Sequence, residues 1–267
     1  MSKPTFNNVE LQQDGPVCTL KLNRPKSLNS LDRQTMLDIH RALDEVQANP
    51  EARVLVITGE GRAFSAGQDL NDDSMQFIDG KAPDIGDLVE ELFKPMVMRL
   101  QNLRIPTLAA VNGVAAGGGG SLALACDLVV AKKSAIFIQV FSRIGLTPDT
   151  GSTWFLTQRV GTARAIGLAM LADNLAADKA AEWGLIWDAV EDDAFDETIQ
   201  DLAHRLAGMP TRALVRIRKL VHDASSNTLE QQLSLEAATI REMGWREDYK
   251  EGVNAFTEKR KPTFTGN

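Results

Sequence analysis

Val111-Asn-Gly-Val-Ala-Ala-Gly-Gly-Gly-Gly-Ser-Leu-Ala-Leu-Ala-Cys-Asp127 is the stretch of this chain that decides its fold: an apolar strand runs into four glycines and then into a helix of small residues. Glycines 117–120 leave several backbone N–H groups unobstructed at a helix N-terminus, where the helix dipole favours negative charge. Such a junction can supply one half of an oxyanion hole. A glycine run on its own is more often only a flexible turn.

A second motif upstream can supply the other half of the hole. Ala63-Phe-Ser-Ala-Gly-Gln-Asp-Leu70 directly follows the apolar strand Arg53-Val-Leu-Val-Ile-Thr-Gly59. Two strand-to-turn segments that end in small residues can direct two N–H groups at one carbonyl oxygen, and a developing enolate requires two such donors.

Together the two motifs resemble those of the crotonase (enoyl-CoA hydratase/isomerase) superfamily. The resemblance covers essentially the whole chain, because Leu22-Asn-Arg-Pro-Lys-Ser-Leu-Asn29 and Tyr249-Lys-Glu-Gly-Val-Asn-Ala-Phe-Thr-Glu-Lys-Arg260 also fit the family pattern. By matching positions, it implies that the hole donors are the backbone N–H groups of Gln68 and Gly118.

Alternating strands and helices predict an α/β core in the first half of the chain. The apolar pattern predicts strands at 17–23, 53–59, 107–111 and 127–131, and helices near 31–48, 85–103 and 118–126. Helical segments then follow one another near 150–172, 177–184, 193–207, 211–225 and 228–258. The resemblance accordingly implies a crotonase-like ββα spiral core over residues 1–200 and a helical C-terminal trimerisation region over residues 201–267. No internal sequence repeat shows the spiral by itself.

The composition argues against two classes of binding partner, nucleic acid and membrane. The chain has 267 residues, 43% of them hydrophobic, and a formal net charge of -7, which argues against nucleic acid as a partner. No apolar run approaches the roughly 20 residues of a membrane span, and Met1-Ser-Lys-Pro-Thr-Phe6 lacks the apolar core of a signal peptide. We therefore expect a cytoplasmic protein that binds neither nucleic acid nor membrane.

The histidines and cysteines show no pattern of a metal or nucleophile site. His40, His204 and His222 lie far apart, without the spacing of metal ligands or of a Ser-His-Asp triad. Cys18 and Cys126 lie in apolar segments and are predicted to be buried, reduced thiols. We expect no metal and no separate cofactor, since the resemblance makes coenzyme A part of the substrate.

The resemblance also implies where coenzyme A binds. In the family, the turn after the second motif's strand holds the adenine end of coenzyme A through main-chain groups and presents one oxyanion N–H. The matching residues here are Ser65, Ala66, Gln68, Asp69 and Leu70. For the phosphates, Lys26 is the best nearby candidate, and Lys259 or Arg260 could contribute from the C-terminal helix. Lysines are more often solvated surface residues, so each of these contacts has that alternative.

Two carboxylates of the family's hydratases are missing. Hydratases place one Glu just after the glycine run and a second on the following segment, and the pair activates water. Those positions hold Ser121 and Phe141, and neither can act as a general base at neutral pH. Ser121 is expected to open or cap the helix with its hydroxyl, and Phe141 to add apolar wall to the acyl pocket.

One carboxylate remains at a matched position, Asp149 in Gly145-Leu-Thr-Pro-Asp-Thr-Gly-Ser-Thr153. The local sequence alone favours an N-cap for a helix that begins near Thr150. Isomerases of the superfamily instead place a catalytic Asp there. A single acid/base beside an apolar wall, which would raise its pKa toward the working pH, suits intramolecular proton transfer rather than water addition.

Within the superfamily, the resemblance is strongest to isomerases that convert 2-(1,2-epoxy-1,2-dihydrophenyl)acetyl-CoA to an oxepin thioester in phenylacetate breakdown. Five segments carry it: 67–72, 112–117, 141–149, 182–187 and 261–266. A Δ3,Δ2-enoyl-CoA isomerase of fatty-acid oxidation would use the same groups and is the enzymatic alternative. An acyl-CoA-binding or RNA-binding relative without activity is the second.

The last predicted helix carries more apolar surface than a short tail can hide against its own domain. Between Leu229 and Thr257, apolar residues recur among charged ones, at Leu233, Leu235, Ala238, Ile240, Met243, Val253 and Phe256. Because family members bury such helices in trimers, we expect a homotrimer or a dimer of trimers. The alternative is a helix packed wholly on its own chain.

Overall fold

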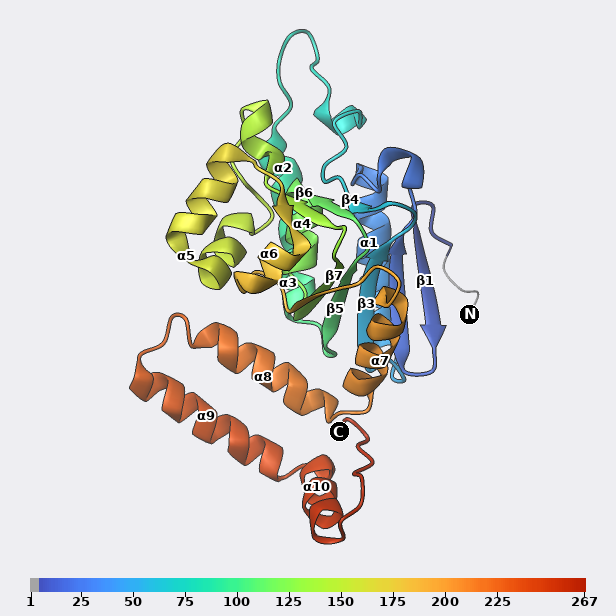
Figure 1. The fold of residues 1–267 in the computed structure, drawn as a ribbon, viewed down its shortest axis with the longest axis vertical. Coiled ribbons are helices and arrows are strands. Elements are labelled where there is room, and N and C mark those ends of the chain that lie inside the picture. The colour runs from blue at the N-terminus through green and yellow to red at the C-terminus, as the bar shows by residue number, and fades with distance from the viewer. Residues whose placement is uncertain (1–4) are drawn as a thin grey trace.

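The strands form two sheets, and from β3 to β8 successive strands alternate between them (Figure 1). The computed structural model describes residues 5–267. The six-stranded sheet has the order β1-β2-β3-β5-β7-β10 and is parallel except for the β1–β2 hairpin. The four-stranded sheet has the order β4-β6-β8-β9 and is parallel except for β8–β9. The strands are β1 (Val9–Asp14), β2 (Val17–Leu22), β3 (Val54–Gly59), β4 (Ala63–Ser65), β5 (Thr107–Val111), β6 (Val114–Ala116), β7 (Leu128–Lys132), β8 (Ile136–Ile138), β9 (Leu175–Ala176) and β10 (Asp188–Val190).

Each turn of the chain adds one strand to each sheet, so that β3 is followed by β4, β5 by β6 and β7 by β8, with helical segments between the pairs. The expected crotonase-like spiral of ββα turns is confirmed. The α-helices are α1 (Arg33–Ala48), α2 (Ile85–Leu88), α3 (Lys94–Gln101), α4 (Gly117–Leu124), α5 (Ser152–Leu171), α6 (Ala177–Glu182), α7 (Phe195–Ala207), α8 (Thr211–Asp223), α9 (Leu229–Gly244) and α10 (Glu247–Thr257). Short 3-10 segments are η1 (Pro25–Ser27), η2 (Asp73–Met75) and η4 (Val140–Ile144), and η3 (Val89–Phe93) is a π-helix.

Both faces of the six-stranded sheet are covered, which explains why its central strands are continuously apolar. Side chains of β3 alternate between the faces. Leu55 and Ile57 belong to the larger core, which contains the buried face of α1. Val54 and Val56 pack in a second cluster with Phe195 at the start of α7. The four predicted strands are found as β2, β3, β5 and β7, each within one residue of its expected bounds.

The predicted helix at 85–103 is instead a composite of α2, the π-helix η3 and α3. Pro95 stands in the first turn of α3 and has no N–H to donate to the preceding turn. That missing donor accounts for the local widening of the helix. A π-helical turn of this kind occurs frequently at functional sites.

The C-terminal helices α8, α9 and α10 extend away from the spiral core as an arm (Figure 1). The prediction of one helix over 228–258 is wrong, because α9 ends at Gly244 and the backbone is extended at Arg246 before α10 begins. At this break the buried Asp248 accepts hydrogen bonds from the backbone of Thr265 and Gly266, which fixes α10 against the end of the chain. The expected domain boundary at residue 200 falls inside α7, and α7 packs on the sheet.

Cys18 and Cys126 are both buried and free, as predicted. Burial raises the pKa of the Cys126 thiol to about 12. Between residues 5 and 267, no helix combines the length and apolarity needed to cross a membrane.

Candidate active site

The turn after β4 and the start of α4 meet at two glycines. Gly67 has a φ of +88°, and a Cβ there would lie 2.7 Å from the carbonyl oxygen of Ala116 and 3.3 Å from the nitrogen of Gly118. A Cβ on Gly119 would lie 2.5 Å from the side chain of Ser65. The contacts of 2.7 and 2.5 Å are ones that real Cβ atoms essentially never make, so only glycine lets the two motifs approach this closely.

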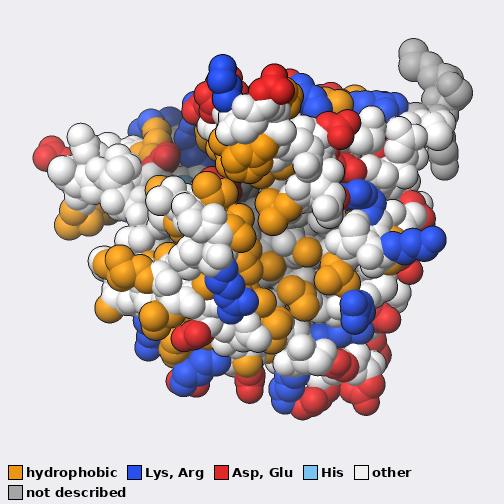
Figure 2. Space-filling model, turned by 90° about the horizontal axis from the view of Figure 1, so that it is seen from above, with side chains coloured by type: hydrophobic (Ala, Val, Ile, Leu, Met, Phe, Trp, Pro, Cys, Tyr) orange, Lys and Arg blue, Asp and Glu red, His pale blue; other side chains and the backbone are white. Residues whose placement is uncertain are grey.

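A cavity of about 250 Å³ opens beside this junction. Gln68 and Gly118, the two expected hole donors, both line it. Its walls are otherwise mostly apolar, and Asp149 and Arg143 are the charged residues among those that line it. Figure 2 views the molecule from the end that carries α2: hydrophobic side chains gather around a hollow near the centre of this face, while charged side chains lie mostly toward its rim.

Asp149 reaches the cavity from the turn between η4 and α5. The hydroxyl of Thr150 donates a 2.8 Å hydrogen bond to its Oδ1. Burial raises the pKa of the Asp149 carboxyl above its usual range, and the Thr150 hydrogen bond opposes part of that shift. The alternative that Asp149 caps a helix is wrong, because α5 begins at Ser152 and its N-cap, Gly151, makes no side-chain cap bond.

At the two positions where hydratases carry carboxylates, the structure agrees with the role expected for Phe141 but not with that expected for Ser121. Phe141 is buried and lines the cavity, as expected. Ser121 lies inside α4 rather than at its end: its hydroxyl donates to the carbonyl of Gly117 one turn earlier and is hydrogen-bonded to the hydroxyl of Ser152. The expectation that Ser121 opens or caps the helix is therefore wrong, since its side chain bonds back within the helix.

The five residues expected to hold coenzyme A fall into two groups. Ala66, Gln68 and Leu70 line the cavity. Ser65 is fully buried, and its hydroxyl donates to the carbonyl of Asn29. Asp69 is also buried, and its carboxylate bonds to residues of this chain that precede α1.

Asp69 forms an ion pair with Arg24 at 2.9 Å and accepts a hydrogen bond from the hydroxyl of Ser30. Although burial acts to raise the pKa of Asp69, hydrogen bonds from the Asn71 backbone and from Arg24 lower it below its usual range. This network holds the second motif against the segment that precedes α1. Sequence reasoning missed it, because the partners lie about 40 residues apart.

The basic residues expected to contact phosphates do not line the cavity. Lys26 is exposed on η1, close in sequence to Arg24. Lys259 follows α10, at the opposite end of the molecule from α2 (Figure 1). Arg260 is engaged by Glu251 and Glu258 at 2.6 Å.

Phe93 is a further cavity residue that the sequence did not indicate. It is the last residue of the π-helix η3, and its ring lies 3.5 Å from the position of a Cβ on Gly118. Within residues 5–267, no three His, Cys, Asp or Glu side chains are grouped so that they could hold a metal ion.

Comparison with known proteins agrees with this geometry. The family model described as enoyl-CoA hydratase/isomerase matches residues 12–267. The chain is 47% identical over 250 residues to a 1,2-epoxyphenylacetyl-CoA isomerase from Escherichia coli (strain K12), covering 94% of this chain and 95% of that protein. It is 41% identical over 262 residues to a probable enoyl-CoA hydratase from Rhodobacter capsulatus, covering 98% and 99% of the two chains. The crystal structure of an enoyl-CoA hydratase from Polaromonas sp. JS666 superposes with a TM-score of 0.89 at 33% identity, covering 96% of this chain and 99% of that one.

Proposed function

The chain belongs to the enoyl-CoA hydratase/isomerase family, and we propose that within this family it is an isomerase of CoA thioesters that uses Asp149 as its single acid/base. One observation supports the proposal: Gln68 and Gly118, the two expected N–H donors, and Asp149 line one cavity whose walls are otherwise mostly apolar. A second carboxylate that could help to activate water is absent from the residues that line it.

The proposed mechanism is a proton transfer within the substrate. The N–H groups of Gln68 and Gly118 donate to the thioester carbonyl oxygen and stabilise the negative charge that develops there. The ionised carboxylate of Asp149 removes a proton from the carbon that the thioester acidifies, which leaves an enolate. The same carboxyl then returns the proton to a different carbon, so that substrate and product are isomers. Coenzyme A is part of the substrate, and no separate cofactor enters the scheme.

For the acyl group, we propose the ring 1,2-epoxide of phenylacetyl-CoA, which would rearrange to the seven-membered oxepin thioester in phenylacetate catabolism. Support comes from the relative at 47% identity, whose name states this substrate, and from the aromatic side chains of Phe93 and Phe141 in the cavity wall. A linear 3-enoyl-CoA could use the same donors and the same carboxylate, and it is the second candidate.

The test is a comparison of kcat/KM for the epoxide thioester and for a linear 3-enoyl-CoA, with Asp149→Asn as the matched variant. We expect the epoxide thioester to be the better substrate. Because Asn cannot exchange the proton, Asp149→Asn should bind the thioester but turn over about 10²–10⁴-fold more slowly. Near-normal turnover in this variant would refute the single-base mechanism. No turnover of either thioester by the wild type would favour the non-enzymatic alternative, for which RNA retention on a filter is the further measurement.

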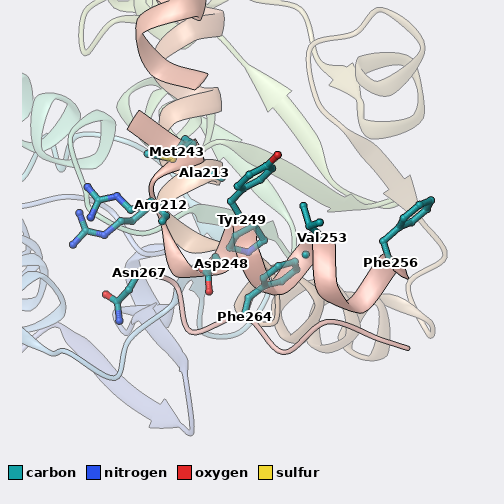
Figure 3. Close-up of a pocket in the computed structure, with 12 residues that line it drawn as sticks. Arg212, Ala213, Met243, Asp248, Tyr249, Val253, Phe256, Phe264 and Asn267 are labelled. Carbon is teal, nitrogen blue, oxygen red and sulfur yellow. The ribbon is translucent and has the colours of Figure 1, made fainter. Parts of the chain in front are cut away.

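We further propose that the protein assembles as a homotrimer or a dimer of trimers through the C-terminal arm. Tyr249, Val253 and Phe256 project from one side of α10 (Figure 3), and Phe256 is 87% exposed in the single chain. Trp245, between α9 and α10, is 85% exposed. Such an apolar surface is typical of a protein interface. In this assembly Lys259 would serve a neighbouring subunit's site, because it lies far from its own.

Light scattering on the full-length chain, together with CoA-thioester titration of a chain truncated after Glu247, tests this assembly. We expect an oligomer for the full chain and weaker thioester binding for the truncated one. A full-length monomer, or normal binding after truncation, would contradict the proposal.

A further inference from the structure

The side chain of Thr150 lies between the carboxylate of Asp149 and the start of α4. Its Oγ1 donates to Asp149 Oδ1 at 2.8 Å, and the same atom lies 3.7 Å from the position of a Cβ on Gly118. Thr150 is only 4% exposed, so that water competes little for its hydroxyl. One hydroxyl thus contacts the acid/base and borders the residue that presents an oxyanion N–H.

The backbone at this position is one that threonine seldom adopts. The N–H of Ser152 donates to the carbonyl of Asp149 at 2.9 Å, which closes a four-residue turn. Its two central residues, Thr150 and Gly151, have φ values of +52° and +80°. Positive φ at both positions defines a type I′ turn, which Gly, Asn and Asp favour. A β-branched residue there is an outlier, and such strain clusters at functional sites.

No other side chain among residues 5–267 donates a hydrogen bond to Asp149, and few charges face it. Gly118 of α4, which borders Thr150, is uncharged, as is Phe93 of the π-helix, which lines the same cavity. From η4, Arg143 lines the same cavity, but its guanidinium donates to the carbonyl of Ala172. The Thr150 hydroxyl is therefore the side chain positioned to fix the carboxylate.

We propose that Thr150 is a positioning residue for the isomerase: its hydroxyl holds the Asp149 carboxylate in the orientation needed for proton transfer and stabilises the ionised form. This inference rests on the proposed function, in which Asp149 is the acid/base. Burial alone would raise the pKa of Asp149 and leave less of it ionised, and a hydrogen bond donated to the carboxylate acts in the opposite direction. The hydroxyl thus keeps a partly buried carboxyl available as a base.

Three variants separate the hydroxyl from the backbone strain. Thr150→Val keeps the shape of the side chain and removes the hydroxyl. Thr150→Ser keeps the hydroxyl and removes the methyl group. Thr150→Gly removes the hydroxyl and also relieves the left-handed backbone. Each variant is compared with wild type by the pH dependence of kcat, by KM and by thermal unfolding.

We expect Thr150→Val to lower kcat by about 10- to 100-fold, because a misplaced reacting group costs about that much, and to change KM little. The acid limb of its pH–rate profile should move to higher pH. Thr150→Ser should keep kcat within about threefold and leave the limb in place. Thr150→Gly should resemble Thr150→Val in rate and profile although its backbone is unstrained. The inference is overturned if Thr150→Val keeps the wild-type kcat and limb, or if Thr150→Ser loses as much as Thr150→Val.

A second readout needs no turnover. Carboxyl ¹³C NMR of substrate-free protein labelled at aspartate follows the titration of Asp149, and the spectrum of Asp149→Asn assigns the signal. We expect Thr150→Val to move this titration to higher pH and Thr150→Ser to leave it unchanged. An unmoved titration in Thr150→Val would overturn the inference even if wild type is an active isomerase. If wild type turns over neither thioester while the titration moves, the proposed function fails and the assignment of the hydrogen bond stands.

Discussion

The close approach of the two glycine turns makes Gly67→Ala the sharpest test of the proposed oxyanion hole. The added Cβ would stand 2.7 Å from the carbonyl oxygen of Ala116 and 3.3 Å from the nitrogen of Gly118. Both neighbours are backbone atoms, one at the end of β6 and one in the first turn of α4, so no flexible side chain can move aside. We therefore expect the two turns to separate and the N–H groups of Gln68 and Gly118 to lose their common target.

The expected magnitudes follow from two effects. Loss of one oxyanion donor costs about 10²–10³-fold in kcat, and Gly67→Ala displaces at least one. The left-handed φ of +88° adds a stability cost of roughly 1–2 kcal/mol for an L-residue, to which the steric contact adds more. Gly15→Ala is the matched control, because Gly15 also has a positive φ, +52°, but a Cβ there would meet no atom within 4 Å.

The two variants are compared by their turnover of the preferred thioester and by urea unfolding. Gly15→Ala should be destabilised only by the cost of its left-handed backbone and should keep its kcat. Gly67→Ala should be destabilised further and should lose at least 10²-fold in kcat. A Gly67→Ala variant that keeps kcat within about threefold of wild type and unfolds like Gly15→Ala would refute this role of Gly67.

Four further predictions concern the residue after the glycine run, the ionisation of Asp149 and the buried ion pair between Asp127 and Arg218. Wild-type protein should leave crotonyl-CoA unhydrated, since the residue after the glycine run is Ser121 rather than an acid; loss of enoyl absorbance above the enzyme-free rate would contradict this. Because burial raises the pKa of Asp149 in the folded chain, turnover should fall as the pH drops through that raised pKa. A raised pKa also means that Asp149 stabilises the fold below its unfolded-state pKa and that this stabilisation is lost as the pH rises through its folded-state pKa. At neutral pH we therefore expect Asp149→Asn to unfold at a higher urea concentration than wild type. An equal or lower urea midpoint would contradict this prediction. Asp127→Ala should lower the free energy of unfolding by roughly 3–5 kcal/mol, because it leaves the buried guanidinium of Arg218 without its carboxylate. Lys94→Ala breaks an exposed ion pair and should lower it by less than about 1 kcal/mol. Urea unfolding measures both.

Four strands of the six-stranded sheet, β2, β3, β5 and β7, could be predicted from the sequence because each is apolar enough to show on its own, whereas the two edge strands β1 and β10 were not among the four predicted ones. The strands of the second sheet could not, since β4, β6 and β8 have three residues each and give no period-two signal. The sequence did indicate the turns that follow β4 and β6, because a close backbone approach requires glycine and so appears directly in the residue types. The membership of the crotonase superfamily expected from those motifs is confirmed.

Side-chain roles were harder to predict wherever a hydroxyl or carboxylate had two partners to choose from. Ser121 and Asp149 both have residue types that favour helix caps, and neither is a cap. The helix register places Ser121 one turn into α4, and two left-handed residues delay the start of α5 beyond Asp149. Asp149 thus lies two residues before the N-cap of α5, Gly151, and Ser121 lies five residues after the N-cap of α4, Ala116.

The topology explains why three separated motifs form one site. In the second sheet β4, β6 and β8 are parallel neighbours, with Ser65 opposite Ala115 and Ala116 opposite Ile138. Segments that leave the carboxyl ends of adjacent parallel strands emerge at the same edge of the sheet. The segment after β4 presents Gln68, α4 after β6 presents Gly118, and η4 with its turn after β8 leads to Asp149. Because the two proposed N–H donors belong to the backbone, the side chains on these segments are free to vary between reactions. In this chain they supply one carboxylate, which is why we infer proton transfer rather than hydration.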